Sequence, residues 1–162
     1  WKSPIYCDNR KTLSYPEVRT YIRDQFVNLI KTKYPQVELI AGVATGAIAQ
    51  GALVAQELEL PFVYVRSAAK NHGLENLIEG EYKEGQKVVV VEDLISTGGS
   101  SLQAVEALRN AGCDVLGMVA IFTYGFQKAI DNFTNAHCVL DTLSDYNAMI
   151  DLGTCRRAMW PS

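Results

Sequence analysis

The sequence lacks the features that mark several classes of protein. Its 162 residues include four cysteines, none in a C-x-x-C pair, which argues against a zinc site or a disulfide framework. No apolar run approaches the ~20 residues of a membrane span, and no signal peptide opens the chain. Lys and Arg number 15 against 18 Asp and Glu, so the net charge of -3 leaves no basic surplus for nucleic acid. These absences predict a cytoplasmic protein with reduced thiols that binds neither membrane nor nucleic acid.

The composition is that of a protein with a substantial core. Hydrophobic residues make up 48% of the chain and charged residues 20%, which are globular values. The length is that of one domain of ~100–200 residues, so we expect a single domain over residues 1–162. The chain starts without Met, and residues 153–157 interrupt a helical pattern. We therefore expect a missing N-terminal segment and a possible internal gap near residues 153–157.

Apolar runs of strand length alternate with amphipathic segments of helix length. The predicted strands are 39–43, 62–65, 88–91, 115–122 and 138–140, and the predicted helices are 15–34, 47–58, one ending near 111, and 127–133. Because the strands are apolar on both faces, we expect an α/β fold, with a parallel sheet and helices on both faces. Residues 66–86 follow neither period and are predicted to form a long mobile loop.

Residues 88–101 carry the strongest chemical signal. Four valines run into Glu92 and Asp93, and a turn of Ser, Thr and Gly then opens a helix. Ligands bind at the carboxyl ends of parallel strands, and the free N–H groups of a helix N-terminus attract anions. Gly98 and Gly99 allow close backbone approach, but no Lys follows them, so the loop is not a Walker loop. The chain has no G-x-G-x-x-G either, which argues against a dinucleotide site.

The two carboxylates would repel a bare phosphate but suit a phosphate attached to a sugar. The loop would hold the phosphate while Glu92 and Asp93 accept hydrogen bonds from ribose hydroxyls. Their charge would also stabilise a cationic ribosyl transition state. The alternative is an ordinary strand–helix turn with N-cap serines and solvated acids, and the acid pair directly after four valines argues against it.

Three stretches resemble a known family. The run from Glu92 to Ser101 is similar to the signature of the phosphoribosyltransferases, in which hydrophobic residues and two acids precede a Thr/Gly/Ser loop and a helix. Residues 3–10 resemble the amino-terminal segment of the orotate members, and residues 66–73 resemble their mobile catalytic loop. The similarity continues through 120–125 and 143–146, so it covers nearly the whole chain.

The resemblance implies a parallel-sheet phosphoribosyltransferase fold and a reaction. Orotate and 5-phospho-α-D-ribose 1-diphosphate would give orotidine 5′-phosphate and diphosphate, with Mg²⁺ as cofactor. The ion would be held mainly by substrate, so no direct metal ligand is expected. A homodimer is implied, in which the mobile loop closes over the neighbouring subunit's site. The implied residues are Arg66, Lys70 and His72 at the diphosphate as catalytic groups, Glu92, Asp93, Leu94, Ile95, Ser96, Thr97, Gly98, Gly99 and Ser100 at the ribose 5-phosphate, and Ser96 also at orotate.

Departures from the family pattern affect the orotate site. Many relatives have a second basic residue where Ser67 stands, and others have an Asp-Arg pair at 123–124, where this chain has Thr-Tyr. The orotate carboxylate is thereby left without an obvious partner. Arg10 and Lys2 are the candidates for that partner.

The turn after the first predicted strand is a further candidate site. Thr45 and Gly46 open at the same sheet edge as residues 92–101, so they are candidates for contact with pyrophosphate. Two alternatives to the orotate reaction stay open. One is transfer to a purine or to uracil. The other is a regulator that senses ribosyl diphosphate, which the lack of a basic face disfavours.

Overall fold

The computed structural model describes residues 7–66 and 77–151. Its elements are η1 (Asn9–Ser14), α1 (Pro16–Lys33), β1 (Leu39–Val43), α2 (Ile48–Leu58), β2 (Phe62–Val65), β3 (Ile78–Glu79), β4 (Lys87–Ile95), α3 (Gly99–Asn110), β5 (Asp114–Thr123), α4 (Gln127–Asn135) and β6 (Leu140–Asp145). Each predicted helix and strand has a counterpart, and all but the last strand lie at nearly their predicted places. Within these ranges, no helix is both long and apolar enough to cross a membrane.

Six strands form one sheet in the order β3-β2-β1-β4-β5-β6. Neighbouring strands are parallel except β2 and β3, which are antiparallel. From β1 the chain moves outward through β2 and β3, then crosses to β4 on the other side of β1. The boundary between β1 and β4 is therefore a switch point, where open α/β sheets bind ligands beyond the carboxyl ends of their strands.

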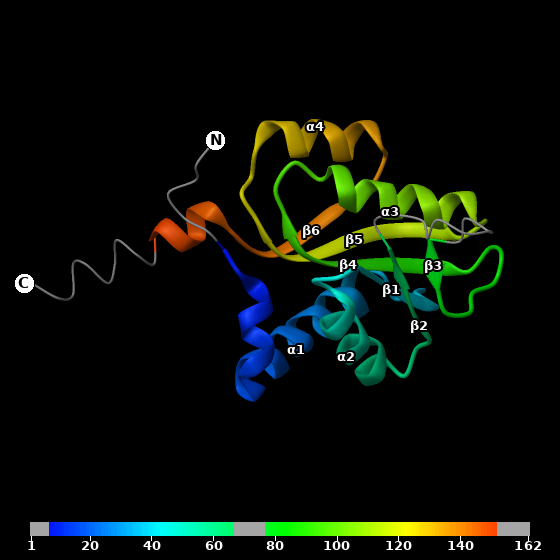
Figure 1. Cartoon of the computed structure of the whole chain (residues 1–162), viewed down its shortest axis with the longest axis horizontal. Coiled ribbons are helices and arrows are strands. Elements are labelled where there is room, and N and C mark those ends of the chain that lie inside the picture. Colours follow the sequence, from blue (N-terminus) through cyan, green and yellow to red (C-terminus); the bar gives the residue numbers. More distant parts are fainter. Residues whose placement is uncertain (1–6, 67–76, 152–162) are drawn as a thin grey trace, which may run out of the picture.

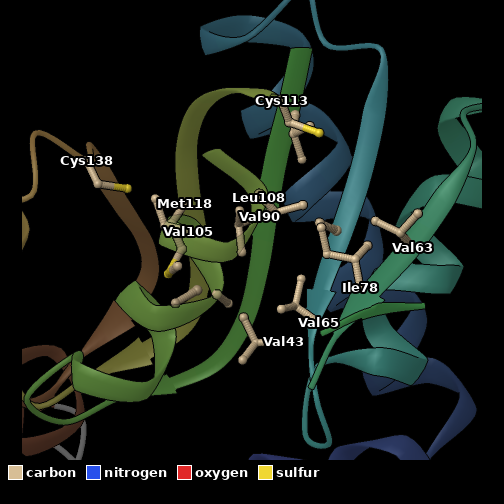
Figure 2. Packing of buried hydrophobic residues seen from close by; sticks show 14 of the residues in the cluster. Val43, Val63, Val65, Ile78, Val90, Val105, Leu108, Cys113, Met118 and Cys138 are labelled. Atoms are coloured by element: carbon tan, nitrogen blue, oxygen red, sulfur yellow. The ribbon is translucent and has the colours of Figure 1, made fainter. Parts of the chain in front are cut away.

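Helices cover both faces of the sheet, as predicted. In Figure 1, α3 and α4 lie on one side of the strands and α1 and α2 on the other. Alternate residues of β4 serve the two layers: Val88 and Val90 join the core on the α3 side, and Val89 and Val91 join the core on the α1 side. Figure 2 shows Val90 close to α3 residues in the first of these cores. Burying each such side chain contributes about 1.5–3 kcal/mol.

The structure corrects the sequence-based expectations in three places. The last strand is expected over 138–140, but β6 begins at Leu140 and pairs with β5 as far as Asp145. The predicted loop 66–86 contains the short strand β3, in which Ile78 is 3% exposed and pairs with Val65. Two residues are too few to show a period of two, so the pattern could not reveal them. Strand β4 also continues to Ile95, four residues past the valines, because β5 runs alongside and pairs with it that far.

Candidate active site

Two turns meet at the switch point between β1 and β4. The turn after β1 holds Thr45, which is exposed, and Gly46, and its Ala44–Thr45 peptide bond is cis. A Cβ atom added to Gly46 would overlap the carboxylate of Asp93 near the end of β4. The structure therefore brings the predicted pyrophosphate turn against one of the two predicted acids.

The two adjacent acids lie on opposite faces of β4. The alternation that sends Val89 and Val91 towards α1 and α2 also sends Asp93 towards the turn after β1. Asp93 is partly exposed there. Glu92 points the other way and is 5% exposed beneath α3. Of these two acids, Asp93 is the one that presents its carboxylate to the open edge of the sheet.

Hydrogen bonds occupy the Glu92 carboxyl group. The hydroxyl of Ser101 donates to Oε2 at 2.8 Å, and the backbone N–H of Asp93 donates to Oε1 at 2.9 Å. Burial is the largest cause that raises the pKa of Glu92, and the Asp93 side chain adds to it. The hydrogen bonds from Ser101 and from the Asp93 backbone lower it, and the net result is a pKa of about 8. Glu92 is therefore mostly protonated at neutral pH. Its predicted contact with ribose stays a prediction.

The loop Ser96–Gly99, which we call the phosphate loop, joins β4 to α3. Its Gly98 has a φ of 79°, which glycine adopts without steric cost, and it is the N-cap residue of α3. Because glycine offers no side chain to cap the helix, the first N–H groups of α3 are available to an anion. Ser96, Thr97 and Ser100 are exposed beside them and add hydroxyl donors. The predicted phosphate site thus lies at the same edge as Asp93.

Sequence reasoning missed two side chains that complete this edge. Asn9 of η1 donates from Nδ2 to the backbone oxygen of Asp93 at 2.6 Å. The backbone N–H of Cys7 donates to the Tyr124 hydroxyl at 3.3 Å. The Tyr124 ring stacks on Phe126, with centroids 5.4 Å apart and planes 10° apart, just beyond β5. Residues 7–9 therefore bridge the ends of β4 and β5, a contact across more than 80 positions that no local pattern could reveal.

The structure describes two of the predicted basic residues, Arg66 and Arg10. Arg66 follows β2, where its side chain forms an ion pair with Glu79 at 3.0 Å. Arg10 lies in η1 with its side chain 58% exposed and 3.3 Å from Asp8. Lys2, Lys70, His72 and the junction near 153–157 lie outside the described residues. Over the described part of the chain, no group of three or more His, Cys, Asp or Glu could hold a metal ion.

Comparison with known proteins settles the family. Residues 13–151 match the family model of the phosphoribosyl transferase domain. Over 93% of its length the chain is 65% identical to an orotate phosphoribosyltransferase of Phocaeicola vulgatus, of which it covers 71%. A Staphylococcus aureus protein of the same name is 60% identical over 93% of the chain and 74% of that relative. The chain belongs to the orotate phosphoribosyltransferase family. Members of this family are glycosyltransferases of the pentosyltransferase type, as the resemblance predicted.

Solved structures agree with that assignment to the orotate phosphoribosyltransferases. The crystal structure of the enzyme from Aeropyrum pernix matches with a TM-score of 0.86 at 27% identity, covering 94% of this chain and 86% of that one. An adenine phosphoribosyltransferase from Leishmania donovani also matches, with a TM-score of 0.76 at 26% identity over 91% of this chain and 73% of that one. The fold is therefore shared across enzymes for different bases. The sequence identity, and not the fold, distinguishes the orotate enzymes.

Proposed function

We propose that this chain transfers the 5-phosphoribosyl group of 5-phospho-α-D-ribose 1-diphosphate to orotate. The products are orotidine 5′-phosphate and diphosphate, a step in pyrimidine (UMP) synthesis. The observation that carries the proposal is the 60–65% identity to orotate phosphoribosyltransferases over 93% of the chain. Transfer to a purine or to uracil, and a purely regulatory role, have no comparable support.

The phosphate loop and Asp93 are the proposed donor site. The N–H groups at the start of α3 and the hydroxyls of Ser96, Thr97 and Ser100 would hold the 5-phosphate. Asp93 would accept hydrogen bonds from the ribose hydroxyls at the switch point. Thr45 and Gly46 would face the diphosphate, because their turn packs directly against Asp93.

The proposed chemistry breaks the bond between C1 of ribose and the diphosphate oxygen and forms a bond from C1 to a ring nitrogen of orotate. That nitrogen loses its proton, which passes to the departing diphosphate or to water. The negative charge of Asp93 stabilises the positive charge that develops on the ribosyl group. Arg66, at the carboxyl end of β2, is proposed to bind the departing diphosphate in exchange for its ion pair with Glu79. Lys70 and His72 are proposed to join it there and to exclude water that would hydrolyse the donor.

The proposed base site lies between residues 7–10 and the end of β5. Tyr124 donates its backbone N–H to the Ile95 oxygen at 3.1 Å, which places it beside Ser96. The aromatic rings of Tyr124 and Phe126 offer a wall for a planar base. Arg10 and Lys2 remain the proposed partners of the orotate carboxylate, with Ser96 as a further contact.

The proposed cofactor is Mg²⁺. The residues fit such an ion, because the Asp93 carboxylate lies against the turn where the diphosphate is proposed to bind, and Mg²⁺ prefers carboxylate and phosphate oxygens. Substrate phosphates would supply most of its oxygens, and Asp93 is the carboxylate that faces the turn. When bound, the ion would neutralise charge on the diphosphate. A homodimer with a loop shared between subunits is proposed on the resemblance alone. A single domain over residues 1–162 is proposed on the length of the chain, and a cytoplasmic location on the sequence features described above.

The test is the ultraviolet absorbance of orotate mixed with protein, ribosyl diphosphate and Mg²⁺. Uracil, adenine and hypoxanthine are run in parallel, and each component is omitted in turn. We expect loss of the orotate band only in the complete mixture. Conversion of another base instead would contradict the proposed acceptor while keeping the donor site. No change in absorbance with any of the four bases would contradict the proposed transfer.

A further inference from the structure

Helix α4 supports the phosphate loop from the side away from the open edge. The Nδ2 group of Asn132 donates to the backbone oxygen of Thr97 at 2.9 Å. The next residue, Phe133, is 3% exposed, and its ring lies so close to Gly98 that a Cβ atom there would approach Cε2 to 2.5 Å. Two consecutive residues of α4 thus contact two consecutive residues of the loop.

The carboxyl end of α4 is fixed as well. Arg109, near the end of α3, donates to the backbone oxygens of Ala136 at 2.7 Å and His137 at 3.0 Å. Within the helix, Ala129 and Phe133 are buried in the core beside the sheet. Helix α4 is therefore held at its core face and at its carboxyl end, so Asn132 has a fixed position relative to the loop.

The hydrogen bond from Asn132 determines the orientation of one peptide group in the loop. In a trans peptide the C=O and N–H groups point in opposite directions. Holding the Thr97 oxygen against α4 therefore directs the Gly98 N–H away from α4. Without this bond the Thr97–Gly98 peptide would be freer to rotate, because Gly98 accepts either sign of φ. A rotated peptide would present its oxygen, which repels an anion, in place of an N–H donor.

We propose that Asn132 is a positioning residue for phosphate binding. Its amide holds the Thr97–Gly98 peptide in the orientation that offers an N–H group to the 5-phosphate of the donor. The inference rests on the proposed function only through the role of the phosphate loop, and not through the identity of the base.

Replacing Asn132 by alanine tests this role. The 5-phosphate is bound alike before and during ribosyl transfer, so N132A should raise KM for ribosyl diphosphate about five- to tenfold and leave kcat within about twofold. KM for orotate should stay unchanged. Calorimetry with ribose 5-phosphate, which involves no turnover, should show the same five- to tenfold loss of affinity.

Two further variants separate positioning from stability. N135A makes the same substitution at an exposed residue of the same helix and should leave both constants within about twofold of wild type. N132D keeps the size of the side chain but removes the N–H donor, so it should weaken binding at least as much as N132A. Wild-type affinity for ribose 5-phosphate in N132D, or equal effects of N132A and N135A, would overturn the inference.

The outcome is independent of the proposed acceptor. If wild type fails to convert orotate and N132A still weakens ribose 5-phosphate binding, the positioning role stands and the orotate reaction does not. If wild type converts orotate and N132A has unchanged KM, the reaction stands and the positioning role is wrong. A lower urea midpoint in N132A with unchanged affinity would likewise overturn it, since that result describes a purely structural residue.

Discussion

The two faces of the sheet treat the end of β4 differently. On the α1/α2 face, Asp93 is partly exposed and its carboxylate lies against Gly46. On the α3/α4 face, Glu92 is 5% exposed and bonded to Ser101 and to the Asp93 backbone. Two carboxylates that are neighbours in the chain therefore have opposite surroundings, because side chains alternate along a strand.

This contrast assigns different work to the two faces. The α1/α2 face supplies a charged group and a turn at the open edge, where ribose and diphosphate are proposed to bind. The α3/α4 face supplies support: Ser101 and Glu92 beneath α3, and Asn132 and Phe133 behind the phosphate loop. Substitutions on the α1/α2 face should lower activity more than stability. Substitutions on the α3/α4 face should lower stability more than activity, or raise KM for ribosyl diphosphate.

The largest effect should follow from G46A. Its new Cβ atom overlaps the Asp93 carboxylate, which is the end of a movable side chain, so the carboxylate would shift while the fold persists. We expect kcat/KM to fall about 100-fold, since a misplaced group in a reacting site has a large effect. The free energy of unfolding, measured with urea, should change by only about 1 kcal/mol.

A double-mutant cycle isolates the cause of the G46A effect. If the substitution acts by displacing Asp93, then G46A made in a D93A background should lower kcat/KM little further. Additive losses would contradict the contact as the cause. An unfolding free energy that falls by several kcal/mol in G46A would instead place its effect in folding.

The second prediction compares the two acids directly. D93N should weaken binding of ribosyl diphosphate about tenfold or more, because a charged acceptor of hydroxyl hydrogen bonds is removed. E92Q should stay within about threefold, because the buried Glu92 is mostly protonated and an amide is close in size. Calorimetry measures both affinities. Equal losses in the two variants would remove the distinction between the faces.

Local sequence patterns were sufficient for most of the fold. The four valines of β4 predicted a doubly buried strand, and the helix-length segments predicted two helical layers. The pattern could not reveal β3, whose two residues are held by pairing with β2 across residues 66–77. The pattern also predicts too short a β4, because Glu92 and Asp93 are typical of a strand end, whereas pairing with β5 extends the strand to Ile95.

Local patterns identify only part of the candidate site. The sequence does not distinguish Glu92 from Asp93, since an acid pair shows its charge but not the face on which each member lies. Asn9 and Tyr124 were absent from the predicted site, because their contacts join positions 84 and 117 residues apart. Asn132 carries no sequence signal at all: its role follows from a helix that only the folded chain brings to the phosphate loop.

The third prediction concerns the two glycines of the phosphate loop. G98A should lower the free energy of unfolding by about 1–3 kcal/mol, because φ is 79° and the new Cβ atom meets the fixed Phe133 ring. G99A is the matched control, since a Cβ atom at Gly99 meets nothing within 4 Å. It should leave stability within about 0.5 kcal/mol in the same urea titration. Equal stability of the two variants would contradict the packing of α4 against the loop.

The smallest effect is the pH dependence that Glu92 gives to stability. Its pKa is about 8 when folded, against an ordinary value of 4.5, so the folded state favours the protonated form. The stabilisation is complete below pH 4.5, declines as the pH rises towards 8, and is lost above it. The difference in unfolding free energy between wild type and E92Q should therefore shift by about 1–3 kcal/mol against wild type between pH 5 and pH 9. If the difference in unfolding free energy between wild type and E92Q stays constant from pH 5 to pH 9, burial does not hold the Glu92 carboxyl group in its neutral form. The contrast between the two faces would then rest on hydrogen bonding alone.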